Sequence, residues 1–354
     1  MSASLGLGAL PRAHGGAAGK ARLRAAPEDF VVREWLGFAA DGEGEHLLLR
    51  VRKRGANTMW VARQLARQAQ IHPRDVGFAG LKDRDAVAEQ AFTVPARSAI
   101  GLAWEGVKGE GYEVLSAERT RRKLKRGALR GNDFEIVLRD FTGDPALLEQ
   151  RLQAMAVAGV PSWFGPQRFG RAGSNLRLAR EWFAGQAEPH ERAQRGFALS
   201  AARAAIFNAV LARRVSDGTW DRLQPGEIVN LDGSGSIFVA EAIDETLQER
   251  CRRLDVHPTG PLWGAVSRDE PTAGTAALEH DVAQRESLLA EGLVRAGLQA
   301  ERRALRAPVR ELQWTIDACD VRMSFRLQRG CFATAVLHEL IENAFDTQVP
   351  ESEE

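Results

Sequence analysis

Alternating apolar and polar residues predict strands in four stretches of this chain. Near the N-terminus, PEDFVVREW (27–35) and HLLLRVRK (46–53) alternate in this way. GNDFEIVLRDF (131–141) has the clearest period of two, and CDVRMSFRLQ (319–328) repeats the pattern near the C-terminus. Because successive side chains of a strand point to opposite faces, this period indicates strands with one buried face.

The stretch 131–141 also predicts which of its side chains share a face. A period of two places Asn132, Phe134, Ile136 and Leu138 together. An amide and a ring followed by aliphatic residues suit a pocket at the end of a core strand. A plain core position also explains Phe134, and the pattern by itself favours that simpler interpretation.

Helix start and stop signals mark four further segments, because a capping residue precedes three of the apolar stripes and Gly330 precedes the fourth. The expected helices are 57–70, capped by Asn57 or Thr58; 144–159, capped by Asp144; 200–214, capped by Ser200; and one from Phe332 onward, after Gly330. LDGSGS (231–236) is typical of a glycine turn between strands.

The stretch PSWFGPQRFGRAGSNLRLA (161–179) is rich in aromatic residues, arginine and glycine. This composition is typical of an RNA-contacting loop, and equally of a compact turn whose rings pack internally. The sequence alone leaves that choice open.

The composition predicts a soluble globular protein of two domains. The chain has 354 residues, more than one compact core usually holds, and 44% of them are hydrophobic. It contains no uninterrupted run of about 18 apolar residues that would predict a membrane span. The N-terminal stretch is broken by Pro11 and Arg12, unlike a secretory signal. We therefore expect a cytoplasmic location.

The cysteine and histidine positions predict neither a disulfide framework nor a metal site. Cys251, Cys319 and Cys331 are odd in number and widely spaced. His338 and Glu339 lie in HELIEN, but a zincin helix needs a second histidine four residues after the first. We therefore expect no metal ion.

Positive charge gathers in one segment although the net charge is only +1. Residues 119–132, RTRRKLKRGALRGN, contain seven basic side chains and no acidic one. Close cations repel one another unless an anion meets them, and a phosphate backbone is the commonest such partner. A flexible basic loop without a ligand is the alternative, and the sequence weighs the two evenly.

Residues 77–90, GFAGLKDRDAVAEQ, place four charged residues directly after an apolar, glycine-containing run. A charge run of this kind is usually a solvated turn, and the residues alone favour that interpretation. Asp83 nevertheless lies at or just beyond the end of the short strand expected here. Catalytic side chains are commonly presented at such a place.

Five separated motifs resemble the tRNA pseudouridine synthase D family in order and spacing: GFAGLKDRDAV, GALRGNDFEIVLR, VPSWFGPQRFGRAGSN, LSAARAAIFN and FRLQRGCFAT. The resemblance covers nearly the whole chain. It implies an α+β fold, in which a pseudouridine-synthase catalytic domain with a mixed, mainly antiparallel sheet is interrupted by an α/β insertion domain. The catalytic domain would comprise residues 1–158 and 307–354, and the insertion residues 159–306.

The resemblance also implies an activity. The family isomerises a uridine of RNA to pseudouridine, typically the uridine at position 13 of tRNA, without a cofactor or metal ion. Its GxKD element places the nucleophilic aspartate at Asp83. The implied substrate contacts are Phe30, Asn132 and Phe332, with Lys82 and Phe134 as second-rank candidates.

The chemistry explains why such residues are needed. The bond from ribose C1′ to uracil N1 breaks, the base turns, and C1′ joins C5, so the nucleotide must be flipped out of its stack. Phe30, Phe332 and Phe134 offer rings for stacking, at ~1–3 kcal/mol for each contact. Asn132 offers both a donor and an acceptor. Asp83 acts either by attack at C1′ or by removing the 2′ proton, and the sequence leaves both routes open.

Two positions depart from the family's pattern. Asp85 stands where histidine or another polar residue is frequent, and its carboxylate tends to raise the proton affinity of Asp83, which Lys82 and Arg84 oppose. Trp163 replaces a frequent tyrosine and keeps a large ring. Neither change removes a residue with an implied chemical role.

The implied partner is tRNA, with other structured RNA as a further candidate, and no protein partner is implied. Two other functions remain as alternatives. One is a non-catalytic RNA-binding or RNA-chaperone protein on the same scaffold. The other is a hydrolase using the pair Asp83 and Asp85, which would need water access and, typically, a metal ion.

Overall fold

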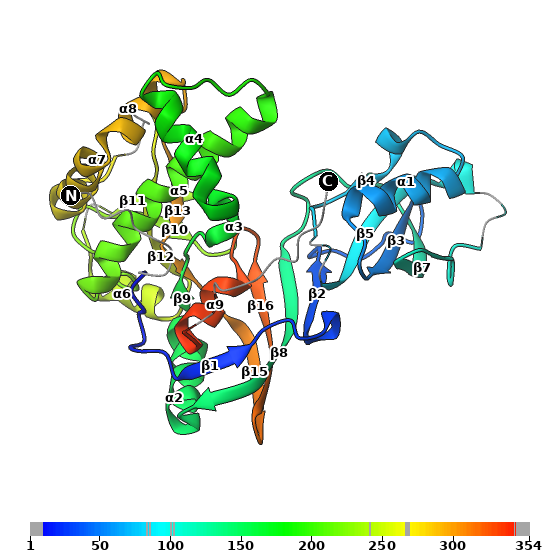
Figure 1. The fold of residues 1–354 in the computed structure, drawn as a ribbon, viewed down its shortest axis with the longest axis horizontal. Coiled ribbons are helices and arrows are strands. Elements are labelled where there is room, and N and C mark those ends of the chain that lie inside the picture. The colour runs from blue at the N-terminus through cyan, green and yellow to red at the C-terminus, as the bar shows by residue number, and fades with distance from the viewer. Residues whose placement is uncertain are drawn as a thin grey trace. The chain divides into compact units, whose positions relative to one another are not determined.

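The computed structural model describes residues 10–82, 84, 86–99, 101, 103–240, 242–265, 270–342 and 344. By its internal contacts the chain divides into two compact units (Figure 1). The sheet unit comprises Ala21–Gly143 and Arg310–Gly330, and the helix-rich unit comprises Met1–Lys20, Asp144–Val309 and Cys331–Glu354. Each unit is therefore assembled from segments that are distant in the sequence.

A ten-stranded sheet dominates the sheet unit. Its strands are β1 (Gly19–Arg22), β2 (Phe30–Trp35), β3 (His46–Lys53), β4 (Gly77–Phe78), β5 (Val87–Pro95), β6 (Lys108–Gly109), β7 (Tyr112–Thr120), β8 (Gly131–Gly143), β15 (Arg310–Asp317) and β16 (Asp320–Gln328). The main path runs β15-β16-β8-β2-β5-β3-β7-β6, with β1 beside β8 and β4 beside β5. These bounds confirm the four strands that alternation predicts.

The direction of the strands fixes the fold class. β2 and β5 run parallel, whereas β8 pairs antiparallel with both β2 and β16. β3 likewise pairs antiparallel with β5 and β7. The sheet is mixed and mainly antiparallel, and together with the helices it confirms an α+β fold.

Helix α1 (Thr58–Gln68) contributes to the core of the sheet unit. The side chain of Asn57 caps it by accepting a hydrogen bond from a backbone N–H of the first turn. Val61 and Leu65 are buried with Leu49 and Phe92 from the sheet. The predicted helix over 57–70 is thereby confirmed.

The helix-rich unit contains two small sheets and a group of helices. Its helices are α2 (Pro145–Ala158), α3 (Pro166–Phe169), α4 (Ser174–Phe183), α5 (Arg192–Ser216), α6 (Glu245–Arg252), α7 (Ala273–Arg285), α8 (Ser287–Arg295) and α9 (Ala333–Leu340). Its strands are β9 (Val160–Pro161), β10 (Ile228–Leu231), β11 (Ile237–Val239), β12 (Val256–Leu262), β13 (Glu301–Ala304) and β14 (Arg306–Ala307). Short 3-10 helices at Pro27–Asp29, Pro73–Asp75, Ala96–Ala99 and Arg171–Gly173 complete the elements of both units.

One predicted helix start is wrong. α5 begins at Arg192 after Glu191, so Ser200 lies inside the helix and not at its cap. The first turns carry Gly196 and few large apolar residues, and a glycine inside a helix costs roughly 0.5–1 kcal/mol. The helix extends through them nevertheless because Ala198 and Ala202 are buried in a core shared with α4 and α8.

Other local predictions hold. Asp144 caps α2 by accepting from two backbone N–H groups, and the turn at 231–236 joins β10 to β11. In the aromatic stretch 161–179, Trp163, Phe164 and Phe169 are buried. The rings of this stretch therefore pack internally, as the compact interpretation predicts, and contact of the stretch with RNA stays a prediction.

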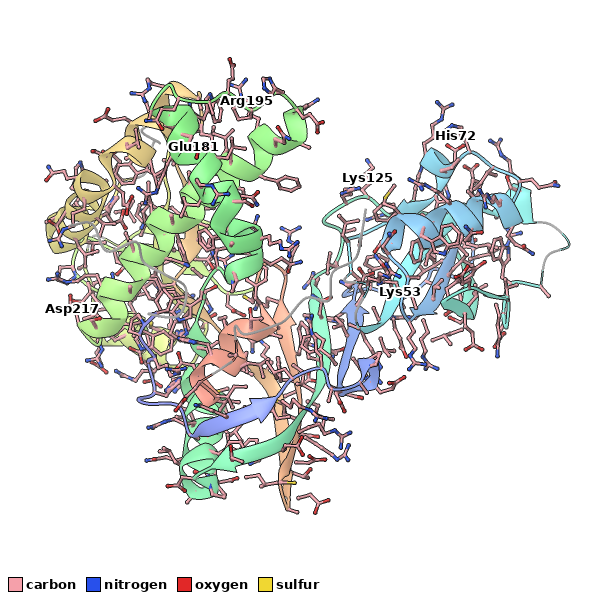
Figure 2. All side chains as sticks on the ribbon, in the orientation of Figure 1. Lys53, His72, Lys125, Glu181, Arg195 and Asp217 are labelled. Atoms are coloured by element: carbon pink, nitrogen blue, oxygen red, sulfur yellow. The ribbon has the colours of Figure 1, made fainter. Side chains whose placement is uncertain are left out.

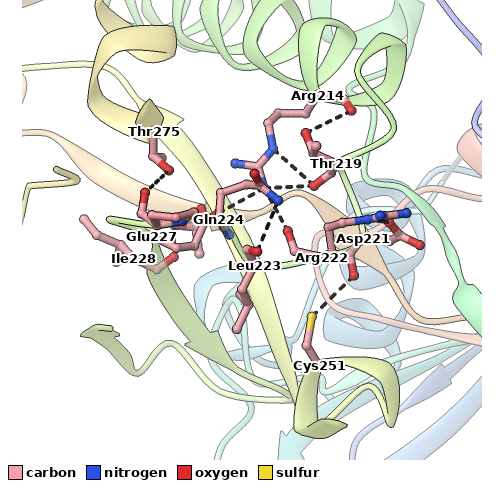
Figure 3. A network of polar contacts seen from close by, with 12 residues as sticks. Arg214, Thr219, Asp221, Arg222, Leu223, Gln224, Glu227, Ile228, Cys251 and Thr275 are labelled. Atoms are coloured by element: carbon pink, nitrogen blue, oxygen red, sulfur yellow. Dashed lines mark hydrogen bonds and ion pairs between the residues drawn. The ribbon is translucent and has the colours of Figure 1, made fainter. Parts of the chain in front are cut away.

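A buried ion pair ties α5 to the segment that follows it (Figure 3). Nη2 of Arg214 lies 2.9 Å from Oε2 of Glu227, and both side chains are almost fully buried. The same guanidinium donates to the carbonyl oxygens of Thr219 and Arg222. Burial raises the pKa of Glu227, and the charge of Arg214 opposes that rise.

The domain division implied by the resemblance, 1–158 with 307–354 and 159–306, differs from the two compact units and stays a prediction. Within the described residues no helix is long and apolar enough to span a membrane.

Candidate active site

The pairing of β2 with β8 brings Glu34 and three of the residues implied by the resemblance to one face of the sheet. Glu34 lies opposite Asn132, Val32 opposite Phe134, and Phe30 two residues further along β2. Because paired residues and their i+2 neighbours share a face, Phe30, Glu34, Asn132 and Phe134 lie on the same side. This agrees with the face predicted for β8.

The rings of Phe30 and Phe134 contact each other edge to face, with centroids 6.1 Å apart. Phe134 also stacks on Phe325 of β16 at 5.3 Å. Both Phe30 and Phe134 are buried, and the guanidinium carbon of Arg24 lies 4.4 Å from the Phe30 centroid. Phe134 is therefore a core residue that packs against Phe30, and the guanidinium of Arg24 lies over the Phe30 ring.

Lys82 bridges the two polar residues of this face. Its Nζ lies 3.1 Å from Oε1 of Glu34 and donates to Oδ1 of Asn132 at 2.7 Å. The side chains of Lys82 and Glu34 are only 9% and 0% exposed. Oε2 of Glu34 also accepts from the backbone N–H of Ala91 at 3.0 Å. The lysine side chain is therefore almost fully buried, and its ammonium is paired with one carboxylate and one amide oxygen.

Buried polar side chains fix the backbone on both sides of Lys82. Its N–H donates to the hydroxyl of Thr58 at 2.9 Å, and its carbonyl oxygen accepts from Nζ of Lys53 at 3.2 Å. Gln90 donates to the carbonyl oxygen of Gly80 at 2.6 Å and accepts from Thr58 at 2.9 Å. Lys53, labelled in Figure 2, is itself buried. The segment that leads into position 83 is thus pre-organised by the core beneath it.

Asp83 and Asp85 lie outside the described residues. Phe332 belongs to the helix-rich unit, where it directly precedes α9 and its ring lies 6.0 Å from that of Phe164. The structure thus brings Lys82 into contact with Asn132 and Phe30 into contact with Phe134.

Glu34 contacts the implied site residue Lys82 and was not identified from the sequence. The signal was present, because the period of two in 27–35 places this acid on the same face as Phe30 and Val32. An acid on an otherwise apolar face of a strand is costly unless it is paired. That cost could have identified Glu34 as the partner of a buried cation.

Asp29 anchors the start of β2, directly before Phe30. Its Oδ1 accepts from Nη2 and Nε of Arg139 at 2.7 and 2.9 Å, and its Oδ2 accepts from the N–H of Ala26 at 2.9 Å. Burial acts to raise the pKa of Asp29, but the hydrogen bonds and charge of Arg139 outweigh it, so the pKa is lowered.

The basic segment 119–130 is anchored to the sheet unit and is not a loose loop. Leu124 is buried, and its N–H donates to Thr93 at 3.0 Å. Arg122, Lys125 and Arg126 remain exposed, and Lys125 is labelled in Figure 2. Among the described residues no group of three or more His, Cys, Asp or Glu side chains is arranged to hold a metal ion.

Known proteins resemble this chain over nearly its whole length. A family model described as tRNA pseudouridine synthase D (TruD) matches residues 11–188 and 190–340. The chain belongs to the tRNA pseudouridine synthase D family. As a member of that family it is a tRNA pseudouridine synthase, an isomerase that acts on uridine in tRNA.

Individual relatives support the same assignment. The tRNA pseudouridine synthase D of Nitrosococcus oceani is 48% identical over 91% of this chain and 90% of the relative. That of Methylococcus capsulatus is 45% identical over 96% of this chain and 95% of the relative. A crystal structure of a putative TruD from Methanosarcina mazei has a TM-score of 0.73 and covers 94% of this chain and 96% of that one. At 22% identity it shows the fold.

Proposed function

We propose that this member of the family isomerises the uridine at position 13 of tRNA, with Asp83 as the nucleophile and the target nucleotide flipped out of its stack. The observation that supports this most is the trio of Glu34, Lys82 and Asn132, in which the nearly buried Lys82 is held one residue before position 83. A fixed cation favours an ionised carboxylate and stabilises the charge that develops when the glycosidic bond breaks.

In this proposal the remaining residues bind the base. Phe30 and Phe332 supply stacking surfaces, each worth ~1–3 kcal/mol, which offset a flipping cost of a few kcal/mol. Oδ1 of Asn132 is engaged by Lys82. The amide nitrogen of Asn132 is then the group that donates to uracil or to the carboxylate of Asp83.

Asp83 serves either of two routes. It attacks C1′ as N1 leaves, or it takes the 2′ proton while the glycosidic bond breaks to give a glycal. In the first route C5 of the turned base bonds to C1′ and displaces the carboxylate of Asp83. In the second route C5 bonds to C1′ of the glycal and Asp83 returns the proton to C2′. In both routes the proton on C5 is lost afterwards. Both need Asp83 ionised, which Lys82 favours. A cytoplasmic location and recognition of other structured RNA stay predictions.

The test is pseudouridine mapping on tRNA by carbodiimide adduct formation and primer extension. Wild-type protein is compared with Asp83→Asn and with the matched control Asp217→Asn, which changes an exposed aspartate of the helix-rich unit (Figure 2). We expect a stop at uridine 13 with wild type and with the control, and none with Asp83→Asn. Full activity of Asp83→Asn would overturn the role of Asp83. Salt-sensitive tRNA binding without any stop would favour the non-catalytic RNA-binding alternative.

A further inference from the structure

Two arginines converge on one buried ring in the helix-rich unit. The guanidinium carbon of Arg303, on β13, lies 4.3 Å from the centroid of Phe164, and that of Arg168, on α3, lies 5.1 Å from it. Phe164 in turn contacts Phe332 at 6.0 Å, and Arg303 lies 5.9 Å from the Phe332 centroid. Two cations therefore lie beside Phe164, and the ring of Phe164 contacts Phe332, which is implied to stack on the base.

Hydroxyl groups hold both guanidinium groups in place. Nη1 of Arg168 donates to Oγ of Ser200 at 2.7 Å. Nη2 of Arg303 donates to Oγ of Ser162 at 2.7 Å and to its carbonyl oxygen at 3.2 Å. Ser200 lies in the middle of α5, so the arginine of α3 is fastened to a long helix. Both guanidinium groups are thus pre-positioned, and both arginines are half-buried residues.

Electrostatics in this cluster favour an anionic ligand. Burial lowers the pKa of both arginines, and the positive charge of Arg168 lowers that of Arg303 further. Burial also raises the pKa of the neighbouring Cys331 thiol, which therefore stays protonated at neutral pH. A bound anion would offset the desolvation of two like charges.

We propose that Arg168 and Arg303 form a binding site for one phosphodiester of the RNA chain, next to the nucleotide that stacks on Phe332. The planar guanidinium fork matches two phosphate oxygens, and two such groups can hold one phosphate from two sides. A contact of this kind carries no sequence information but fixes the register of the chain. This inference rests on the proposed role of Phe332, and it adds an anchor that keeps the flipped nucleotide in place.

The test combines neutral phosphate analogues with conservative variants. Methylphosphonate linkages are placed one at a time around the target uridine of tRNA, and the dissociation constant is measured for wild type, Arg168→Gln and Arg168→Lys. We expect one linkage whose neutralisation weakens wild-type binding about tenfold. Arg168→Gln should show a similar loss with unmodified tRNA and no further loss at that linkage, and Arg168→Lys should be intermediate.

Salt dependence gives an independent measurement. The slope of log affinity against log salt concentration should fall by about 0.7 to 0.9 for Arg168→Gln, the value for one phosphate contact. The double variant with Arg303→Lys should change the slope little further, since lysine keeps the second positive charge. Arg285→Gln, which changes an exposed arginine of α7, is the matched control and should keep the wild-type slope.

Two results would overturn the inference. One is an unchanged salt slope in Arg168→Gln. The other is a neutralisation penalty in Arg168→Gln equal to that of wild type at every linkage. If the Arg303→Lys variant does not fold, the salt slope and the neutralisation penalty are still measured with Arg168→Gln alone. Binding is also measured for each variant with Asp83→Asn added, in which the proposed reaction is not expected to occur. Failure of the proposed reaction and failure of this phosphate site are then separate results.

Discussion

The ammonium of Lys82 donates to the side-chain oxygen of Asn132 at 2.7 Å while it is ion-paired with Glu34 at 3.1 Å. Lys82 lies in the segment before β5, Asn132 on β8 and Glu34 on β2. Because both partners accept from Lys82, the lysine fixes the orientation of the Asn132 amide. Each residue of the trio is expected to affect catalysis through the other two.

Asn132→Asp is expected to lower the single-turnover rate of pseudouridine formation by roughly 10²-fold, the usual loss for one pre-organised donor. The change keeps the acceptor for Lys82 but removes the amide donor. Quenched-flow sampling followed by pseudouridine mapping measures the rate, and the surface variant Gln186→Glu serves as control. A wild-type rate in Asn132→Asp would show that the donor has no part in the reaction.

Thr58→Val is expected to slow the reaction at least tenfold and to lower the free energy of unfolding by about 1–3 kcal/mol. It deletes the hydroxyl that accepts from the N–H of Lys82 and donates to Gln90, and so leaves buried groups unpaired. Urea unfolding and single-turnover rates are the measurements. Thr315→Val, on an exposed position of β15, should change neither, and equal behaviour of the two variants would contradict the prediction.

Removing charge from the basic segment is expected to weaken tRNA binding without changing the rate at saturation. The double variant Arg122→Gln, Lys125→Gln should lower the salt slope by about 0.7 to 0.9 for each lost phosphate contact. Fluorescence anisotropy of labelled tRNA over a salt series is the measurement. An unchanged slope would show that this segment does not face the RNA.

The buried pair of Arg214 and Glu227 is expected to be costly to break. Arg214→Ala should lower the free energy of unfolding by roughly 3–5 kcal/mol, because it leaves Glu227 uncompensated in the core. Arg213→Ala, next to it on α5, removes only an exposed pair with Asp217 and should cost well under 1 kcal/mol. Denaturant unfolding compares the two variants, and similar losses would contradict the prediction.

The lowered pKa of Asp29 predicts acid sensitivity. Since its folded pKa lies below the unfolded value of about 3.9, its contribution to stability is complete above that value and is lost as pH falls through the folded pKa. Asp29→Asn should therefore destabilise the protein at pH 7 by about 1–3 kcal/mol and lose less stability than wild type below about pH 4. Melting temperatures from pH 7 down to 3 measure this, and parallel curves for the two proteins would contradict it.

Much of the local structure followed from the sequence. The period of two located β2, β3, β8 and β16 because one face of each is buried. Cap residues placed the starts of α1 and α2, since an Asn or Asp side chain satisfies otherwise unpaired backbone donors. Ser200 led to a wrong helix start, because serine also occurs inside helices. There the burial of neighbouring residues in the core decides whether the helix continues.

The sequence by itself determined four strands, the caps of α1 and α2 and, through five motifs, the family and the implied role of Asp83. Only the tertiary structure decided that Lys82 joins Glu34 to Asn132, and that Arg168 and Arg303 meet at Phe164. Periodicity and capping act over a few residues, whereas these contacts join segments far apart in the chain. Such contacts depend on strand register and on which buried charges find a partner, and these are properties of the folded core.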